Sequence, residues 1–235
     1  DSLFIGLTAG SYTVKVKDEN DNVTNYTNNP VVLEQPAELV IDSMSYEHVT
    51  GCYGDANGSI AVATSGGSGE LEYSIDGGST WQLDSVFAGL GPGEYSAIVR
   101  DTNQCTTTYS NNPITLTQPE ELVIDSVDVT NVTGSAGNSN GSIAVATSGG
   151  TGQLQYSIDS GSTWQADSIF SGLQAGDYGI VVEDANGCTT WFSNNPVRIA
   201  EPDELVISSV EVTHFTGCYG DATGEIAITA KGGVG

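Results

Sequence analysis

The segment NNPITLTQPEELVIDS, residues 111–126, decides the fold because it occurs three times at one spacing. Residues 28–43 read NNPVVLEQPAELVIDS, and residues 194–209 read NNPVRIAEPDELVISS. The copies start at residues 28, 111 and 194, so the period is 83 residues without an insertion. A fixed period of this length indicates an array of repeated units, each of which contacts only its neighbours.

The prolines within these segments mark the predicted boundaries of the repeats, at Pro36, Pro119 and Pro202. The sequence therefore predicts the C-terminal part of one repeat (1–36), two full repeats (37–119 and 120–202) and the N-terminal part of a fourth (203–235). Because both outer parts are incomplete, we expect the chain to be a window from a longer array.

Within a repeat, apolar residues alternate with polar ones, which is typical of strands buried on one face. In the first full repeat the alternating apolar positions are Leu39, Ile41, Ile60, Val62, Leu71, Tyr73, Ile75, Tyr95, Ala97 and Val99. About seven short strands in roughly 80–100 residues indicate an immunoglobulin-like sandwich. We therefore expect an all-β fold of tandem immunoglobulin-like β-sandwich repeats that form an elongated rod.

A second pattern supports the sandwich. Residues 90–95 read LGPGEY and resemble a tyrosine corner, in which the Tyr hydroxyl bonds to backbone a few residues upstream. Residues 7–12 and 173–178 repeat the pattern. Tyr12, Tyr95 and Tyr178 are the tyrosines concerned.

The charge excludes several classes of function. The chain has 30 Asp and Glu against 5 Lys and Arg, a formal net charge of −25. Binding to nucleic acid requires clustered basic residues, so we expect no nucleic-acid partner. No apolar run approaches the roughly 18–20 residues that span a bilayer, so we expect no membrane insertion. No signal peptide opens the sequence, and any export signal is expected outside it.

Four further motifs occur in a fixed order. They are GSIxV (58–62 and 141–145), GGxG (66–69 and 149–152), YSIDGG (73–78) and GLxxGxYxxxVxDxNxC (89–105 and 172–188). In this order the sequence resembles the SprB-type repeats of giant cell-surface adhesins of Bacteroidota, the gliding-motility adhesin family. The resemblance implies type IX secretion, an extracellular location on the bacterial cell surface, and work in adhesion, often in gliding motility. Two departures stand out: Asn22 replaces Cys105 and Cys188, and Ser135 replaces Cys52 and Cys218.

The strings SIDGGSTW (74–81) and SIDSGSTW (157–164) match the Asp-box pattern of sialidase propellers. A sialidase needs a cluster of Arg for its substrate carboxylate, and this chain has two. We therefore interpret the pattern as a structural turn. In this turn Asp76 and Asp159 accept backbone N–H bonds, while Trp81 and Trp164 pack beneath.

The sequence contains no other arrangement of residues that favours catalysis. His48 and His214 occupy one repeat position, but Asn131 stands there in the middle repeat. A general base needed in each repeat could not be replaced in this way. We expect no enzyme activity and no required cofactor.

Calcium at the junctions between repeats is an open alternative. The turns at 55–58 and 184–187 carry the candidate oxygen ligands Asp55, Asn57, Asp184 and Asn186. Neither continues as an EF-hand loop, and Asx–Gly turns also form without metal.

The four cysteines follow particular strands. If each repeat has seven up-and-down strands, Cys52 lies at the pole facing the next repeat, while Cys105 and Cys188 lie at the opposite pole. A Cys52–Cys105 bridge would exceed the roughly 7 Å limit between Cα atoms. We therefore predict a Cys52–Cys188 disulfide, with Cys105 and Cys218 pairing in repeats outside this sequence. Four free thiols or a bridge within one repeat are the alternatives.

Asp followed by Ser and an aliphatic residue resembles the O-glycosylation signal of Bacteroidota. The candidate acceptors are Ser2, Ser43, Ser85, Ser126 and Ser168. The alternative is that these are polar residues on the outer face of a strand.

These observations favour a structural stalk segment of a large secreted cell-surface adhesin or filament, without catalysis. The expected partners are neighbouring repeats of the same chain, with surface polysaccharide or other filament chains as further candidates. The alternative is a carbohydrate-binding or accessory β-sandwich module of a secreted polysaccharide-degrading enzyme, with Trp191 or Tyr109 stacking on sugars. Thr108 stands at the position of Trp191 in the preceding repeat, so a repeated sugar site is not supported.

Overall fold

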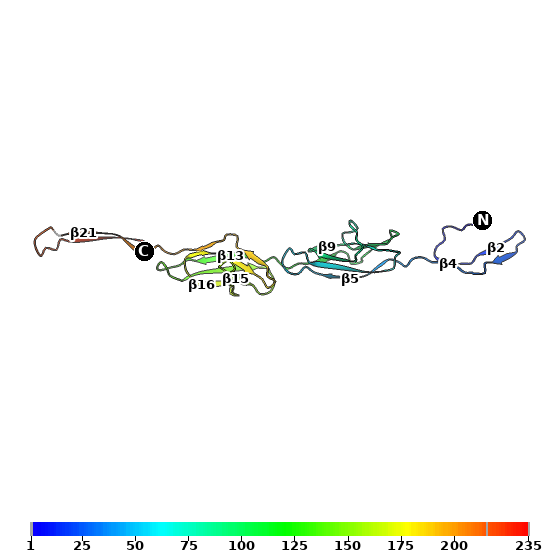
Figure 1. Cartoon of the computed structure of the whole chain (residues 1–235), viewed down its shortest axis with the longest axis horizontal. Coiled ribbons are helices and arrows are strands. Elements are labelled where there is room, and N and C mark those ends of the chain that lie inside the picture. The colour runs from blue at the N-terminus through cyan, green and yellow to red at the C-terminus, as the bar shows by residue number, and fades with distance from the viewer. Residues whose placement is uncertain (1, 215, 235) are drawn as a thin grey trace. The chain divides into compact units, whose positions relative to one another are not determined.

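The computed structural model describes residues 2–214 and 216–234, and their regular elements are all β-strands (Figure 1). The predicted all-β fold is confirmed. Among these residues there is no helix with the length and hydropathy that crossing a bilayer requires.

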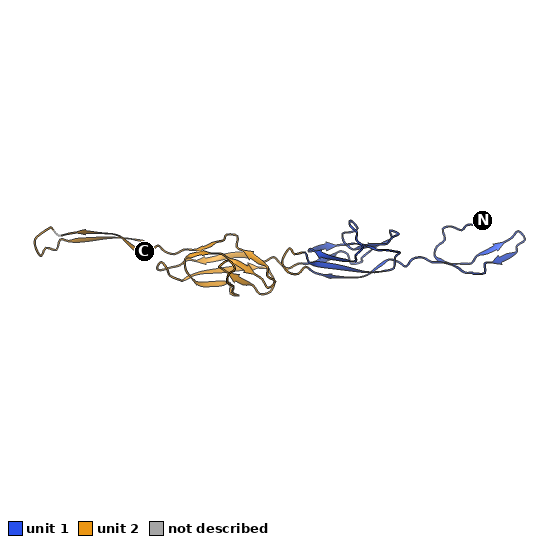
Figure 2. Cartoon of the chain, viewed as in Figure 1, with its two compact units in different colours: residues 1–48, 56–117 blue, residues 49–55, 118–235 orange. Residues whose placement is uncertain are grey.

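The chain forms two compact units (Figure 2). Unit 1 comprises Asp1–His48 and Ala56–Thr117, and unit 2 comprises Val49–Asp55 and Gln118–Gly235. The backbone therefore leaves unit 1 after His48, contributes seven residues to unit 2, and returns at Ala56. The predicted boundary at Pro119 lies close to the second division, whereas the excursion of 49–55 has no counterpart in the predicted division.

The described residues of unit 1 form twelve strands. They are β1 (Gly10–Tyr12), β2 (Lys15–Lys17), β3 (Val23–Asn25), β4 (Val31–Leu33), β5 (Val40–Glu47), β6 (Gly58–Ser65), β7 (Glu72–Ser74), β8 (Val86–Leu90), β9 (Gly93–Tyr95), β10 (Ile98–Arg100), β11 (Thr106–Thr108) and β12 (Ile114–Leu116). All pairings between these strands are antiparallel: β5-β6-β8, β7-β10-β11, and the pairs β9-β12, β1-β4 and β2-β3.

The core of unit 1 lies between these sheets. Ile60 on β6, Val99 on β10 and Leu116 on β12 are each at most 1% exposed, although their strands belong to three different sheets. Together with Leu39, Val62, Ile75 and Ile114 they form one hydrophobic cluster. Burial from facing sheets into a common core is the arrangement of a β-sandwich.

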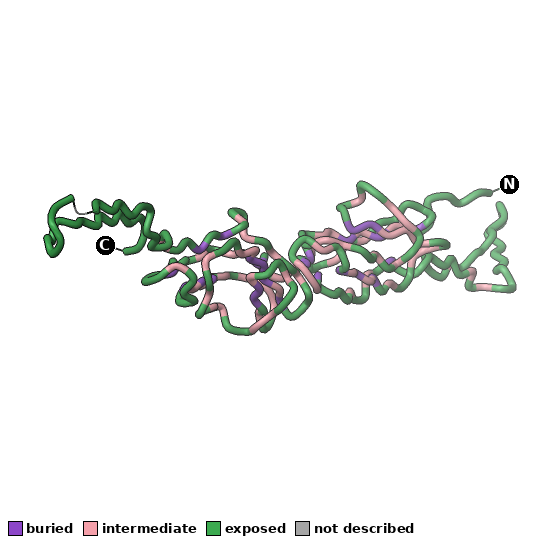
Figure 3. Tube along the Cα trace, turned by 60° about the vertical axis from the view of Figure 1, so that its left-hand side comes forward, coloured by how far each residue is buried: buried purple, intermediate pink, exposed green. Residues whose placement is uncertain are grey.

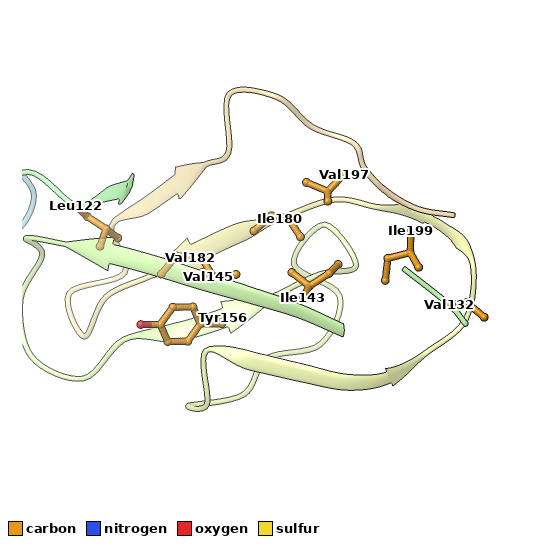
Figure 4. Close-up of a cluster of buried hydrophobic side chains, with 9 residues drawn as sticks. All are labelled: Leu122, Val132, Ile143, Val145, Tyr156, Ile180, Val182, Val197 and Ile199. Atoms are coloured by element: carbon orange, nitrogen blue, oxygen red, sulfur yellow. The ribbon is translucent and has the colours of Figure 1, made fainter. Parts of the chain in front are cut away.

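Unit 2 repeats this plan. Its strands are β13 (Val123–Thr130), β14 (Gly141–Ser148), β15 (Gln155–Ser157), β16 (Ile169–Leu173), β17 (Gly176–Tyr178), β18 (Val181–Glu183), β19 (Thr189–Trp191), β20 (Val197–Ile199), β21 (Val206–Thr213) and β22 (Glu225–Lys231). The sheets are β13-β14-β16, β15-β18-β19, β17-β20 and β21-β22. Ile143, Ile180 and Ile199 are each at most 1% exposed in its core (Figure 4). By contrast, the hairpin β21-β22 is exposed along its length (Figure 3).

The strands keep the spacing seen in the sequence, since β5, β13 and β21 begin at residues 40, 123 and 206. Each full repeat contains eight strands, however, where about seven were expected. The alternating run Tyr95, Ala97 and Val99, expected as one strand, is divided into β9, which pairs with β12, and β10, which pairs with β7 and β11. The assumed up-and-down order is also wrong, because β8 returns to the sheet of β5 and β6 after β7 has joined β10.

Candidate functional site

The candidate site is the loop Val49–Asp55, here called the Cys52 loop, which makes a disulfide and hydrogen bonds to residues far away in the sequence. It lies entirely within unit 2. Cys52 forms a disulfide with Cys188, with 5.5 Å between the two Cα atoms and 136 residues between the partners in sequence. The structure thus joins the two cysteines that were expected to meet.

The loop has an internal turn that presents the cysteine. The Asp55 carboxylate accepts the backbone N–H of Cys52 at 2.8 Å, and the Asp55 N–H donates to the Cys52 carbonyl at 3.1 Å. Val49, at the start of the loop, is 3% exposed. An apolar anchor and a closed turn together hold the Cys52 sulfur in one place.

Two side chains of unit 2 hold the loop from outside. The Asn186 Nδ2 donates to the Gly51 carbonyl at 3.0 Å, and the Gly54 N–H donates to the Gln118 Oε1 at 2.9 Å. A groove of about 210 Å³ remains beside the disulfide, lined by Tyr53, Pro119 and other residues of unit 2. The disulfide and these two hydrogen bonds therefore join the loop to the rest of unit 2.

Cys188 is positioned by a buried carboxylate. Asp184 is 5% exposed, and its Oδ1 accepts the backbone N–H groups of Asn186 and Cys188, each at 2.9 Å. Its Oδ2 accepts the Thr151 N–H at 2.8 Å, which ties this turn to the GGxG turn. A buried charge requires such donors to offset its lost hydration. Sequence reasoning missed this role, because Thr151 is 33 residues from Asp184.

These contacts define where the calcium candidates lie. The carboxylates of Asp55 and Asp184 accept backbone N–H groups, and Asn186 donates to Gly51. Asn57 lies immediately before β6. Within residues 2–214 and 216–234 no three His, Cys, Asp or Glu side chains form a group suited to a metal ion. Calcium binding stays a prediction.

The Asp box forms a closed turn. Asp76 Oδ1 accepts the N–H groups of Ser79 and Thr80, each at 2.9 Å, while its Oδ2 accepts the Thr80 hydroxyl at 2.6 Å. The Ser74 hydroxyl donates to Oδ1 at 2.7 Å. The Thr80 hydroxyl, the Thr80 N–H and the Ser74 hydroxyl hold the pKa of Asp76 well below its usual range.

The second Asp box has the same chemistry. Thr163 donates to Asp159 through its hydroxyl at 2.6 Å and its N–H at 2.8 Å, and Ser157 donates at 2.7 Å. Led by the Thr163 hydroxyl, these bonds lower the pKa of Asp159 to about 2. A carboxylate whose oxygens accept these hydrogen bonds stabilises the turn.

The tryptophan of the first box is packed and bonded. Trp81 is half-buried and its Nε1 donates to the Gly78 carbonyl at 3.0 Å. The Arg100 guanidinium lies 4.2 Å above its ring centroid and bonds Glu72 at 2.7 Å, which lowers the pKa of Glu72. Trp164, its counterpart in unit 2, is also half-buried.

His48 and Asn131 share one structural role that the sequence did not reveal. The His48 Nδ1 accepts the Thr117 N–H at 3.1 Å, and the Asn131 Oδ1 accepts the Ala200 N–H at 2.9 Å. Both residues offer an acceptor at the same place, which explains why one replaces the other. His214, the third residue of this set, is exposed.

The tyrosine corners are formed in all three places. The hydroxyls of Tyr12, Tyr95 and Tyr178 donate to the carbonyls of Thr8, Gly91 and Gln174, at 2.6, 2.9 and 2.9 Å. Each bond closes a loop four residues back along the chain, as the corner pattern requires.

The candidate glycosylation serines differ in exposure. Ser2, Ser43 and Ser126 are exposed, whereas Ser85 and Ser168 are half-buried. Glycosylation at any of them stays a prediction.

The remaining candidates are two cysteines and two aromatic residues. Cys105 and Cys218 are exposed free thiols. Trp191 is 55% exposed, while Tyr109 packs against the core of unit 1. Of the two aromatics considered for sugar stacking, therefore, only Trp191 has an open face.

Residues 51–80 match the SprB repeat family, a segment that spans most of the Cys52 loop, β6, β7 and much of the Asp box. No curated protein matches the chain. The C-terminal 282-residue fragment of intimin, solved in complex with the translocated intimin receptor intimin-binding domain, is similar over 72% of this chain and 67% of that chain. The identity is 16% and the TM-score 0.36, a likeness that carries no functional inference. By its motifs and this family match, the chain carries an SprB-type repeat at residues 51–80.

Proposed function

We propose that this chain is a stalk segment of a large secreted cell-surface adhesin, in which it sets length and spacing and performs no catalysis. The SprB-type repeat at residues 51–80 supports a surface protein of the adhesin type. Export by the type IX route and a part in gliding motility are finer elements of the same proposal.

The observation that carries the proposal is the Cys52 loop. The chain passes between the two units three times, after His48, after Asp55 and after Thr117. The Cys52–Cys188 bond fixes the excursion within unit 2. A protein whose task is spacing benefits from such a junction, because a single flexible linker would let the distance between units vary.

The chemistry of the carboxylates supports a structural role as well. Asp76, Asp159, Asp101 and Asp184 accept hydrogen bonds that close turns. The net charge of −25 favours solubility and repulsion between neighbouring chains.

Small-angle X-ray scattering tests the spacing function. In the Cys105→Ser/Cys218→Ser background, which retains the Cys52–Cys188 bridge and cannot form disulfides between copies, we expect one extended distance distribution. This distribution should broaden when Cys52 and Cys188 are also replaced by Ser. A compact globule both with and without the bridge would contradict a stalk.

Surface location needs a separate measurement. Antibodies raised against unit 2 should label intact, unpermeabilised cells of the source organism, and external protease should remove the signal. Labelling that appears only after permeabilisation would contradict the surface assignment.

A further inference from the structure

Unit 1 contains a groove with the same polar contact groups as the one that holds the Cys52 loop. It has a volume of about 370 Å³ and is lined by residues from Gln35–Leu39, Gly67–Ser68 and the stretch from Asp101 to Thr107. In unit 2 the equivalent groove, with the loop seated beside it, retains about 210 Å³.

The groups that hold the Cys52 loop recur one period earlier. Gln35, Asn103 and Cys105 stand 83 residues before Gln118, Asn186 and Cys188. Those three residues of unit 2 supply the two hydrogen bonds and the disulfide to the loop. The groove of unit 1 therefore has the full set of contact groups.

The supporting turn in unit 1 has the same geometry. Asp101 is 3% exposed, and its Oδ1 accepts the N–H groups of Asn103 and Cys105, each at 2.9 Å. Its Oδ2 accepts the Ser68 N–H at 3.0 Å. Asp184 makes the corresponding bonds in unit 2, so the Cys105 backbone is held in the same way as that of Cys188.

The matching loop is present at the other end of the chain. Residues 216–222 read TGCYGDA, identical to residues 50–56. Cys218 donates its N–H to the Asp221 carboxylate at 2.6 Å, and the Asp221 N–H donates to the Cys218 carbonyl at 3.0 Å. These are the two bonds that shape the Cys52 loop. Cys218 and Tyr219 are both exposed.

We propose that the 216–222 loop of one copy of this chain docks into the unit 1 groove of a second copy, where a Cys218–Cys105 disulfide closes the contact. Asn103 then donates to the Gly217 carbonyl, and Gln35 accepts the Gly220 N–H. The loop and the groove lie at different places on the chain, so the contact is heterologous and can propagate beyond a dimer.

The covalent step needs a disulfide oxidant, for which glutathione disulfide is the probe. The Cys218 thiolate attacks it, releases one glutathione thiolate and forms a mixed disulfide. The Cys105 thiolate then displaces the second glutathione, so two protein thiols are oxidised and one glutathione disulfide is reduced to two thiols.

The test is oxidation of the purified chain in a glutathione buffer over a range of protein concentrations, followed by non-reducing gels and peptide mapping. We expect a concentration-dependent ladder in which Cys105–Cys218 is the dominant new link and Cys52–Cys188 is retained. Mixing Cys105→Ser with Cys218→Ser protein should give dimers alone, because each variant keeps one half of the contact.

Variants of the unit 1 groove distinguish docking from random oxidation. Gln35→Ala/Asn103→Ala should slow the formation of the heterotypic link about tenfold, since two hydrogen bonds are lost. Gln153→Ala, an exposed glutamine of unit 2, is the matched control and should leave the rate unchanged. Cys105–Cys105 and Cys218–Cys218 links at levels similar to the heterotypic link, or a rate insensitive to the groove variants, would overturn the proposal.

Discussion

Removing the Cys52–Cys188 bridge should destabilise unit 2 and leave unit 1 nearly unchanged. The cross-linked cysteines are 136 residues apart, and loop-closure entropy over that length corresponds to about 5 kcal/mol. Residues 56–117 within the closed segment belong to unit 1 and have their own core, so they do not unfold with unit 2. The shorter unfolded length lowers the expected loss to about 4 kcal/mol.

Calorimetry of the Cys52→Ser/Cys188→Ser variant measures this effect, with hydrogen exchange assigning each transition to a unit. At about 4 °C per kcal/mol for a unit of this size, the unit 2 transition should fall by roughly 15 °C. The Cys105→Ser/Cys218→Ser variant serves as the control, and neither of its transitions should move. An equal fall of both transitions, or no fall, would refute the reasoning that the Cys52 loop is part of unit 2.

Two further predictions concern the turns. Thr163→Val removes the main cause of the lowered pKa of Asp159, so the carboxyl should titrate above its present value of about 2, toward 3.8. Because the folded pKa lies below the unfolded one, the stability from this carboxylate is present above the unfolded value and is lost as the pH falls through the folded value. The Thr163→Val variant should lose this stabilisation at a higher pH than the unsubstituted protein. Carbon NMR of the carboxyl measures the midpoint, and an unchanged midpoint would contradict the assignment. Gly66→Ala places a Cβ 1.8 Å from the Glu38 carbonyl oxygen at φ +73°, whereas Gly77→Ala has the same φ and nothing within 4 Å. Urea unfolding should show a loss of about 1 kcal/mol for Gly77→Ala from φ alone and a loss at least about 2 kcal/mol larger for Gly66→Ala. Equal losses would show that the close approach is relieved at little cost.

Features whose partners lie within a few residues could be expected from sequence. The Asp76 turn closes over four residues, and the Tyr95 hydroxyl reaches back four residues. In both cases a short pattern of residue types defines the geometry. The alternation of apolar residues was likewise sufficient for the all-β fold.

Features that join distant residues were not accessible in this way. Asp184 accepts from Thr151 across 33 residues, and His48 accepts from Thr117 across 69 residues. Asp184 was considered as a calcium ligand because a lone Asx–Gly turn does not reveal which donors the fold brings to it. The strand count failed for a related reason. The division of residues 95–99 between β9 and β10 depends on their partners, which are β12 for β9 and the strands β7 and β11 for β10.

The disulfide also changes how tension would travel along the molecule. The shortest covalent path from the first residue to the last runs to Cys52, crosses the sulfur–sulfur bond and continues from Cys188. Strands β6 to β18 all lie in the bypassed stretch, so a pull on the two ends places no direct load on them. Reduction would return that stretch to the path and release up to about 460 Å of extended chain, at about 3.4 Å per residue. Oxidation state thus determines how far this protein can be drawn out before it becomes taut.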